Sequence, residues 1–301
     1  MRRKENIELV HISHSKDSSD GGISIAVKEL FSKQLSIKKS WICSNSFPAI
    51  SRDINLAKQI INSNADILHI HGLWRSPTRI ARFGLTRNNL PYIIAPHGML
   101  DSWALKQSYF RKKIVYSLWE YSTISNASCI QALCENELLS IKKLFPNVPV
   151  AIIPNGINIP DLSINATTLP VWNNDNRKKD EKILLFIGRF HKKKGIANLL
   201  TAWKKICLSD QKHNWRLVFV GYGDSNYIKK RIERESINNC SIYNSVFGIK
   251  KDSVFRNASA FILPSYSEGL PMAAIEAMSY KLPCLLSRAC NLQKIYESNA
   301  Y

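Results

Sequence analysis

A pair of glutamates is the strongest chemical signal in the sequence. Glu268 and Glu276 enclose seven residues and follow an apolar segment, and Gly269 and Pro271 lie shortly after the first of them. Glycine allows a tight turn, proline suits the first position of a helix, and the N–H groups of a strand-to-helix turn attract an anion. The two carboxylates could therefore bind hydroxyl groups at the two ends of an extended ligand whose phosphates lie between them. The alternative is that both are ordinary charges on a solvated helix.

A cationic loop follows another apolar segment. Residues 186–195 read Phe-Ile-Gly-Arg-Phe-His-Lys-Lys-Lys-Gly, so that Arg189 and Lys194 lie between two glycines. A guanidinium group can bind two phosphate oxygens at once, and a lysine adds a compact positive charge. The loop is therefore a candidate phosphate site, unless it is only a solvated basic loop.

Two further candidates each follow a predicted strand. Gly21-Gly22 forms a short glycine turn, although the full G-x-G-x-x-G pattern of dinucleotide sites is missing. His97 comes directly after a strand and is followed by Gly98. A lone histidine is usually structural, but the carboxyl end of a parallel strand is where ligands bind, so this placement favours a ligand contact.

Short apolar strands alternate with amphipathic helices along the chain, which predicts parallel sheets covered by helices on both faces. The pattern breaks at 160–180, where prolines and polar loop residues precede a basic run. We therefore expect two Rossmann-like domains, over 1–159 and 160–301, with ligands at the carboxyl ends of their strands. The predicted strands are 7–13, 40–43, 66–70, 91–95, 127–133 and 150–153, then 182–187, 216–220, 241–246, 260–263 and 284–286.

One predicted helix, over 105–123, combines basic and aromatic residues. These residues are Lys106, Arg111, Lys112 and Lys113, with Tyr109, Phe110 and Trp119. Each basic residue near an anionic leaflet contributes about 1 kcal/mol to membrane binding, so the helix is a candidate for peripheral contact with an anionic membrane. Alternatively, it has a core face and a basic solvent face.

The composition narrows the classes of protein. The chain has 42 basic against 23 acidic residues, and the resulting net charge of +19 is spread over both halves. Such a surface favours anionic partners. Only this charge suggests a nucleic-acid-binding protein, because the chain has no RNP or zinc-finger motif. We therefore expect no nucleic-acid partner.

The cysteines and the apolar runs indicate the compartment. Seven cysteines without a C-x-x-C pair predict reduced thiols rather than disulfides or a structural zinc site. No apolar run approaches the roughly 18 residues of a membrane span, and the basic start lacks the apolar stretch of a secretory signal. We expect a cytoplasmic protein, either free or attached peripherally to the inner face of the plasma membrane.

Taken together, the motifs resemble those of retaining glycosyltransferases of the large group 1 family (family 4), which have the GT-B fold. The resemblance covers nearly the whole chain in order. Its motifs are Gly21-Gly22, Pro96-His97-Gly98-Met99, Pro154-Asn155-Gly156-Ile157-Asn158, Gly188-Arg189-Phe190 to Lys194-Gly195, and Glu268-Gly269-Leu270-Pro271 to Glu276-Ala277-Met278. The GT-B fold implies two Rossmann-like domains with a cleft between them.

The resemblance also implies an activity. A group 1 enzyme moves a sugar from a nucleotide-sugar donor to a saccharide or lipid-linked acceptor, here in bacterial cell-surface polysaccharide or lipopolysaccharide synthesis, including O-antigen. Retention is described in this family as a same-face attack in which the leaving phosphate helps to deprotonate the acceptor. Cations and helix N-termini can stabilise the charge that the leaving diphosphate gains. Neither a metal ion nor a cofactor is therefore expected.

Particular residues take their roles from the resemblance. Arg189 and Lys194 would bind the diphosphate of the donor, and Glu276 would bind the ribose hydroxyls. Glu268 would hold the donor sugar and the distal phosphate together with the backbone amides of two residues, Gly269 and Leu270. The first domain would supply Gly21 and Gly22 to the donor site, and His97 beside the reacting sugar.

Two departures from the family pattern stand out. Gln293-Lys294 replaces the usual Pro-Glu, and the chain stops at Tyr301, well before family members usually end. We therefore expect a second domain that is incomplete at its C-terminus. The alternative to an active transferase is a truncated, inactive homologue that binds nucleotide or a partner without turnover.

Overall fold

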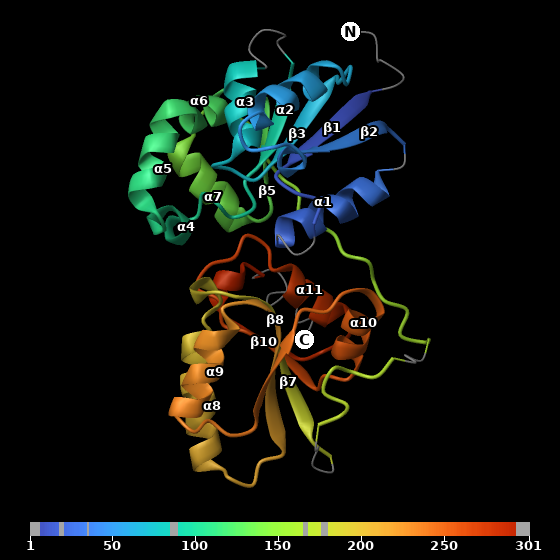
Figure 1. The fold of residues 1–301 in the computed structure, drawn as a ribbon, viewed down its shortest axis with the longest axis vertical. Helices are drawn as coiled ribbons and strands as arrows, with labels where there is room; N and C mark the ends of the chain where they lie inside the picture. Colours follow the sequence, from blue (N-terminus) through green and yellow to red (C-terminus); the bar gives the residue numbers. More distant parts are fainter. Residues whose placement is uncertain are drawn as a thin grey trace. The chain divides into compact units, whose positions relative to one another are not determined.

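The computed structural model describes residues 7–17, 21–34, 36–84, 90–164, 168–175 and 180–292. The chain divides into two compact units, Met1–Gly156 (unit 1) and Ile157–Tyr301 (unit 2), close to the expected boundary after residue 159 (Figure 1). Each unit is built around one parallel sheet. The unusual Gln293-Lys294 pair lies outside the described residues.

Unit 1 contains a six-stranded sheet in the order β2-β1-β3-β4-β5-β6. Its strands are β1 (Glu8–Ser13), β2 (Lys38–Cys43), β3 (Ile67–His71), β4 (Tyr92–Ala95), β5 (Cys129–Ala132) and β6 (Val150–Ile152). Its helices are α1 (Gly22–Lys33), α2 (Arg52–Ile61), α3 (Ser76–Gly84), α4 (Ser102–Lys106), α5 (Tyr109–Val115), α6 (Tyr121–Ser125) and α7 (Glu135–Leu144), with the short η2 (Ser44–Ser46) and the π-helical η3 (Tyr116–Glu120). The strand order reverses between β1 and β3, and ligands of such sheets bind at this switch point.

Apolar side chains on the central strands form the core of unit 1. Val10 and Ile12 of β1, and Leu68 and Ile70 of β3, have no exposed surface. Both strands are buried almost throughout, as expected where helices cover the two faces of a parallel sheet.

The single helix expected over 105–123 is wrong. The structure has four shorter elements there, α4, α5, η3 and α6. The helix is interrupted between α4 and α5 at Ser108, whose backbone is left-handed with φ 54°. At the end of η3, the buried Glu120 accepts hydrogen bonds from the Trp74 N–H and the Thr78 hydroxyl, both at 2.9 Å. Burial raises the pKa of Glu120 to about 7. This carboxyl group ties the π-helical turn to α3 and to the segment that follows β3.

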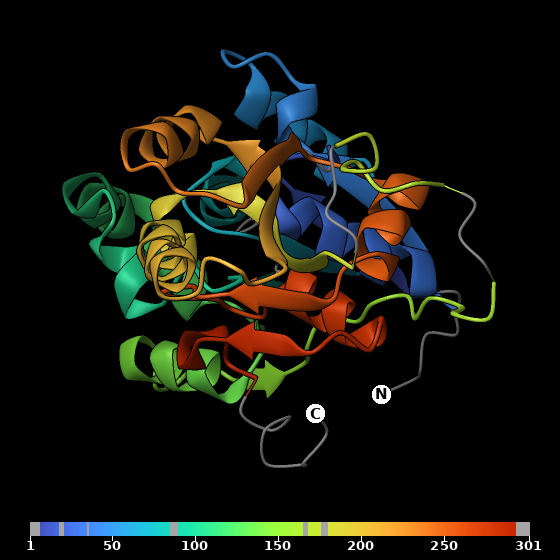
Figure 2. The ribbon, with the colours of Figure 1, turned by 90° about the horizontal axis from the view of Figure 1, so that it is seen from below.

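Unit 2 contains a five-stranded parallel sheet in the order β11-β10-β7-β8-β9. Its strands are β7 (Lys182–Phe190), β8 (Trp215–Gly223), β9 (Cys240–Asn244), β10 (Ala260–Leu263) and β11 (Cys284–Leu286). Its helices are α8 (Ile196–Ser209), α9 (Ser225–Arg234), α10 (Gly248–Arg256) and α11 (Met272–Ser279), with the short η4 (Lys192–Lys194) and η5 (Arg288–Cys290). Here the switch point lies between β7 and β10, and Figure 2 shows β10 and β11 as neighbouring arrows.

The spacing of apolar residues in the sequence explains the core of unit 2. Five consecutive residues of β7, Ile183 to Ile187, are buried. The buried face of α8 is made by Ile196, Leu199, Leu200 and Trp203, which recur at the spacing of one helical face. Figure 1 shows α8 and α9 on one side of this sheet, and α10 and α11 on the other. The two sheets confirm the expected pair of parallel α/β domains.

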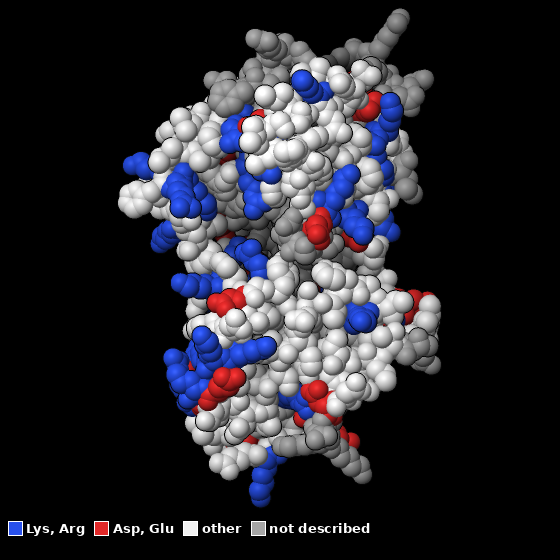
Figure 3. Space-filling model, in the orientation of Figure 1, with Lys and Arg blue, Asp and Glu red and all other residues white. Residues whose placement is uncertain are grey.

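On the face drawn in Figure 3, the basic side chains of the described residues do not form one stripe. Lys and Arg lie scattered there over both units with acidic side chains among them. Among the described residues, no helix combines the length and the apolar character that crossing a bilayer requires.

Candidate functional site

In unit 2, the loops that leave β7 and β10 are joined at the switch point. The Tyr266 N–H donates to the Lys193 carbonyl at 2.8 Å. Gly195 has φ +69°, and a Cβ there would lie only 2.0 Å from the Pro264 carbonyl oxygen. The glycine is therefore required both by its backbone conformation and by the close approach of the second loop.

Two of the predicted site residues meet at this junction. The Lys194 Nζ lies 2.6 Å from Oε1 of Glu268, which also accepts from the Ser265 hydroxyl at 2.5 Å. Glu268 is only 7% exposed, and its backbone is fixed by a hydrogen bond to the Ala289 carbonyl at 3.0 Å. Its second oxygen, Oε2, makes no hydrogen bond with the described residues and can accept one from a ligand.

Arg189 lies five residues before Lys194, near the end of β7. Its side chain is exposed and forms no ion pair with the described residues. Directly before it, Gly188 pairs with Gly221 of β8, where a Cβ on Gly221 would lie 1.9 Å from the Gly188 carbonyl oxygen, so no side chain fits at that position. An exposed cation next to this pair of glycines is suited to an anionic ligand.

Glu276 has a partner that no pattern in the sequence predicts. On α11, its Oε1 lies 2.6 Å from the Nζ of Lys251, which belongs to α10. About a fifth of each side chain is exposed (20% and 23%). Glu268 and Glu276 are therefore both paired with lysines and are not solvated helix charges. Between them, Gly269 is buried and Leu270 is half-buried where the chain turns into α11.

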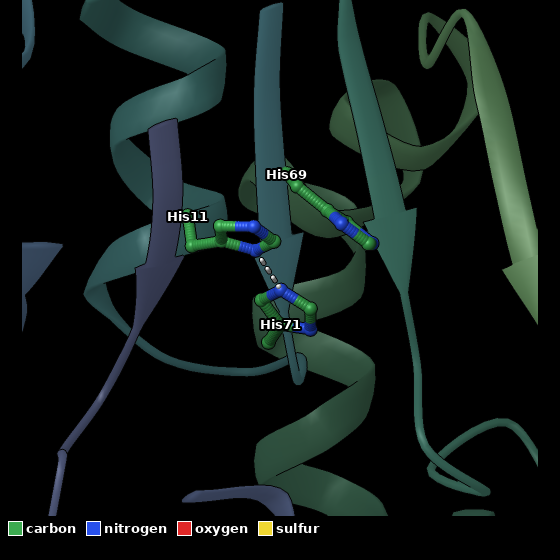
Figure 4. A group of neighbouring side chains, drawn as sticks. All are labelled: His11, His69 and His71. Atoms are coloured by element: carbon green, nitrogen blue, oxygen red, sulfur yellow. Dashed lines mark hydrogen bonds between the residues drawn. The ribbon is translucent and has the colours of Figure 1, made fainter. Parts of the chain in front are cut away.

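In unit 1, a cluster of buried histidines lies at the switch point. His11 of β1 is directly opposite His69 of β3, and His71 lies two residues further on the same face. Figure 4 shows the His11 Nδ1 facing the His71 Nε2, at 3.0 Å. Burial lowers the pKa of His11 and of His71, and it lowers the pKa of His69 to about 3. The cluster is therefore neutral at pH 7.

The predicted His97 joins this cluster. It follows β4 with φ 53°, and its Nε2 lies 3.2 Å from the His71 Nδ1. The loop is held by the buried Glu137 of α7, which accepts from the Gly98 N–H at 2.5 Å and from the Leu133 N–H at 2.7 Å. Burial lowers the pKa of His97 to about 4. His97 is therefore a neutral imidazole in a fixed loop.

The glycine turn of unit 1 also lies at its switch point. Gly21 has φ 118° and is the N-cap of α1, and its carbonyl accepts from the Ser24 hydroxyl at 2.8 Å. A Cβ on Gly22 would meet nothing within 4 Å. The residues 18–20 before this turn lie outside the described residues. Of the predicted site residues, Gly21, Gly22 and His97 thus belong to unit 1, and the others belong to unit 2.

Three of the histidines are close enough to be considered as metal ligands. One ring nitrogen each of His11, His69 and His71 lies within 4.8 Å of the others. However, His11 and His71 each use both ring nitrogens in hydrogen bonds, to Gln34, to His97 and to one another. A metal ion would have to displace these contacts, because a coordinated nitrogen cannot also take part in them.

The sequence predicts His97 as a site residue but does not point to the residues that support it. His69 and His71 form an H-x-H pattern that places both side chains on one face of a strand, and this signal was available. The contribution of His11 depends on β1 lying next to β3, which the strand pattern does not reveal.

Comparison with known proteins identifies the family. A family model described as "Glycosyl transferases group 1" matches residues 171–300, and one described as "Glycosyltransferase Family 4" matches residues 31–160. The chain belongs to the group 1 glycosyltransferases. The resemblance expected from the motifs is thereby confirmed.

Curated relatives of this glycosyltransferase include proteins with named substrates. The chain is 30% identical over 155 residues to an uncharacterised glycosyltransferase of Methanocaldococcus jannaschii, covering 50% of this chain and 39% of that protein. It is 27% identical over 253 residues (78% and 60%) to the UDP-Gal:alpha-D-GlcNAc-diphosphoundecaprenol alpha-1,3-galactosyltransferase of Escherichia coli. It is 24% identical over 244 residues (77% and 59%) to the GDP-mannose:cellobiosyl-diphosphopolyprenol alpha-mannosyltransferase of Xanthomonas oryzae. The matches thus span less than two thirds of each relative.

Solved structures agree on the fold. Sucrose-phosphate synthase from Thermosynechococcus elongatus has a TM-score of 0.74 and 18% identity, covering 96% of this chain and 83% of that one. Anabaena HepE in complex with UDP-glucose has a TM-score of 0.69 and 12% identity, covering 96% and 83%. The fold of this glycosyltransferase is therefore GT-B.

Proposed function

We propose that this glycosyltransferase moves a sugar, with retention of configuration, from a nucleotide-sugar donor to a lipid-linked saccharide in cell-surface polysaccharide synthesis. The names of two relatives support this substrate class, because they pair UDP-Gal or GDP-mannose with a diphosphopolyprenol-type saccharide. The inactive, nucleotide-binding homologue remains the second candidate, and turnover separates the two.

The observation that carries the proposal is the Lys194–Glu268 pair, with Arg189 five residues before the lysine and in no ion pair with the described residues. Lys194 and Arg189 supply positive charge for a diphosphate. Glu268 keeps one carboxylate oxygen for a sugar hydroxyl while Lys194 and Ser265 hold the other. A site that offers both a cation and a hydroxyl acceptor fits the diphosphate and the sugar of one ligand.

The main requirement of the reaction is stabilisation of the negative charge on the leaving group, rather than a strong general acid or base. As the bond between sugar and phosphate breaks, the nucleoside diphosphate gains negative charge, and preorganised cations lower the energy of that state. Lys194 and Arg189 take this role in the proposal, with no metal ion or cofactor required. The leaving phosphate takes up the acceptor proton on the same face of the sugar, which gives retention.

Glu276 takes the other end of the donor. Its carboxylate accepts hydrogen bonds from the two ribose hydroxyls, and Lys251 orients it through the contact at 2.6 Å. Gly269 and Leu270 give backbone amides to the distal phosphate. In unit 1, Gly21 and Gly22 line the donor site, and His97 contacts the reacting sugar.

Because the proposed acceptor is lipid-linked, the proposal includes contact of α5 and η3 with the membrane surface. Three apolar side chains there are largely exposed: Phe110 at 80%, and Ile114 and Leu118 at 61% each. Lys106, Arg111 and Lys113 are exposed as well, which gives the mixed apolar and basic surface of an interfacial helix. Lys112 differs from the other three, because its Nζ donates to the Ala104 carbonyl at 2.5 Å and lies 5.5 Å from the Trp74 ring centroid.

A thermal-shift titration with UDP, GDP and ADP in the presence of EDTA tests the proposal. A nucleotide at one hundred times its dissociation constant stabilises the folded protein by about 2.7 kcal/mol. We expect one nucleotide to raise the melting temperature, and the rise to disappear in Arg189→Ala and in Glu276→Ala. Absence of any shift from a cooperatively folded sample would contradict the donor site. Incubation of the bound donor with polyprenyl-diphosphate saccharides then distinguishes an active enzyme from a binding homologue.

A further inference from the structure

A continuous chain of hydrogen bonds leads from the end of α1 to His97. Oε1 of Gln34 lies 2.8 Å from the His11 Nε2, and the His11 Nδ1 lies 3.0 Å from the His71 Nε2. The His71 Nδ1 lies 3.2 Å from the His97 Nε2. Each imidazole in the middle of the chain therefore uses both of its nitrogens, one toward each neighbour.

Every hydrogen bond in such a chain must donate in the same direction, and the group at its end decides which direction that is. A neutral imidazole has one N–H donor and one acceptor nitrogen. Because the Gln34 Oε1 can only accept, His11 carries its proton on Nε2, and its Nδ1 must accept from the Nε2–H of His71. The same step repeats at the next link, so that His97 donates from Nε2 to the His71 Nδ1. His97 is then left with an unprotonated Nδ1.

We propose that Gln34, His11 and His71 are positioning residues that hold His97 in its Nε2–H tautomer, so that its Nδ1 accepts a hydrogen bond from a ligand hydroxyl group. The hydroxyl part of this inference rests on the proposed function, in which His97 contacts the sugar, whereas the tautomer does not. An acceptor nitrogen favours a polyol at this point and disfavours an oxyanion, which has no proton to donate.

The surroundings keep the chain neutral, as the argument requires. A second proton on His11 or His71 would place two N–H groups face to face and break a link. Burial is the main cause that lowers the pKa of His11, His71 and His97, and Lys39 and the neighbouring His69 oppose protonation further. Lys39 itself donates to the Phe31 and Gln34 carbonyls at the end of α1. A cation thus lies at the start of the chain, where it repels an extra proton.

The position of the His97 Nδ1 suits a ligand contact. His97 is half-buried, and its Nδ1 has no hydrogen-bond partner within the described residues and is not among the fully buried polar atoms. The loop is fixed by Glu137 through the Gly98 N–H. Both the ring direction and the backbone of His97 are therefore set before a ligand arrives, which reduces the cost of ordering on binding.

The tautomer can be read directly by NMR of the full chain labelled with 15N-histidine, without nucleotide and with EDTA. Long-range proton–nitrogen correlations distinguish the protonated ring nitrogen from the unprotonated one, and a His97→Asn variant assigns the signals. We expect His97 to carry its proton on Nε2. A proton on Nδ1 would overturn the proposal, and so would a His11 or His71 spectrum that changes when EDTA is replaced by Zn²⁺ at equal concentration to the protein, because a metal site would then replace the chain.

A pair of variants at Gln34, the half-buried first residue of the hydrogen-bond chain, tests its direction. Gln34→Glu keeps an oxygen acceptor, and we expect the His97 tautomer to stay unchanged. Gln34→Met removes the acceptor without adding a donor, and we expect a second tautomer of His97 to appear beside the first. Identical spectra of Gln34→Met and the wild-type protein would remove Gln34 from the mechanism.

Binding separates this inference from the proposed function. With UDP-glucose, UDP-galactose and GDP-mannose as probes, we expect Gln34→Met to weaken nucleotide-sugar binding severalfold while binding of UDP or GDP alone is unchanged, because one hydrogen bond to a hydroxyl is lost. If His97 shows the Nε2–H tautomer but no nucleotide binds, the hydrogen-bond chain is supported and the proposed function is rejected. Equal losses for UDP and UDP-sugar would reject the hydroxyl contact.

Discussion

Lys194 and Glu268 are 74 residues apart in the sequence, yet the lysine Nζ lies 2.6 Å from the glutamate Oε1. The contact exists because β7 and β10 are neighbours in the sheet and their carboxyl ends lie at one edge. In the proposed donor site, a nucleoside diphosphate would meet a cation already held by a carboxylate, so that the lysine would lose little side-chain entropy on binding.

Replacement of Lys194 is the first prediction. In Lys194→Met, the diphosphate loses a cation and the nearly buried Glu268 loses its charged partner. We expect affinity for the bound nucleoside diphosphate to fall by at least about tenfold, and stability to fall by about 1–3 kcal/mol. Calorimetric titration and urea unfolding measure the two effects. Lys192→Met is the matched control, since Lys192 is exposed in the same loop. An equal loss of affinity in this control would show that the effect comes from the overall positive charge and not from a specific contact of Lys194.

Glu276 is predicted to recognise the ribose. We expect the wild-type protein to bind the 2′-deoxy form of its nucleoside diphosphate several times more weakly than the ribonucleotide, because one hydroxyl no longer donates to the carboxylate. In Glu276→Gln this preference should shrink toward equality. Competition between the two nucleotides in a binding assay measures it. A preference that survives the substitution would place the ribose elsewhere.

Glu137 is predicted to stabilise unit 1 through the loop that carries His97. Both of its oxygens accept backbone N–H groups, and in Glu137→Gln one amide NH₂ would face an N–H. We expect a loss of about 1–3 kcal/mol in the unfolding free energy of unit 1. Glu135→Gln, at an exposed position of the same helix, should change it little. Hydrogen exchange at the amides of β4 and β5 reports the difference, and equal protection in the two variants would contradict this role.

The buried histidines predict a loss of stability in acid. The unfolded chain protonates these imidazoles below pH 6.5, whereas His69 titrates only near 3 and His97 near 4 when folded. The unfolded state therefore binds more protons, and stability falls as the pH decreases from 6.5, by up to about 1.4 kcal/mol per pH unit for each histidine. Glu120, with its pKa raised to about 7, acts in the opposite direction between pH 4.5 and 7.

A single variant isolates the contribution of one histidine. His69→Leu removes a buried Nε2 that has no hydrogen-bond partner among the described residues, and it leaves Glu120 in place. Between pH 7 and pH 5, we expect this variant to lose about 2 kcal/mol less stability than the wild-type protein. Native-state hydrogen exchange at the β1 and β3 amides gives both values. Parallel pH curves would show that His69 is already charged in the folded protein.

Membrane attachment is predicted to depend on Arg111 and Lys113 and not on Lys112. We expect each of Arg111→Glu and Lys113→Glu to weaken sedimentation with anionic vesicles by roughly fivefold or more, following the contribution of about 1 kcal/mol for each basic residue near the leaflet. Lys112→Met is the control, because that side chain is held by Ala104. Neutral vesicles should bind little in every case. If both charge-reversal variants sediment with the vesicles as the wild-type protein does, α5 does not contact the membrane and its basic face is only solvated.

The sequence predicts the alternation of strands and helices because strands buried on both faces read as continuous apolar runs, as in residues 183–187. It also predicts where Arg189, Lys194, Glu268 and His97 lie, because each follows such a run. The roles given to these residues stay predictions until the variants are measured.

The partners of the site residues could not be predicted in the same way. Lys251 meets Glu276 only because α10 and α11 pack near one another, and His11 meets His71 only because β1 lies beside β3. The break at Ser108 escaped for a different reason. Its left-handed backbone is favoured by no local pattern, so a polar Gln107-Ser108 pair within an amphipathic stretch was the only hint.

The π-helical turn at Tyr116–Glu120 has a consequence for changes in chain length. Such a turn holds one residue more than an α-helical turn, so removing a residue within 116–119 restores α-helical geometry and leaves the flanking helices in phase. The same deletion at 135–136, at the start of α7, rotates the neighbouring residues by about 100° relative to the preceding chain and turns Glu137 away from the loop that it holds. Gene variants that lack one codon should therefore be tolerated in the first segment and eliminated in the second.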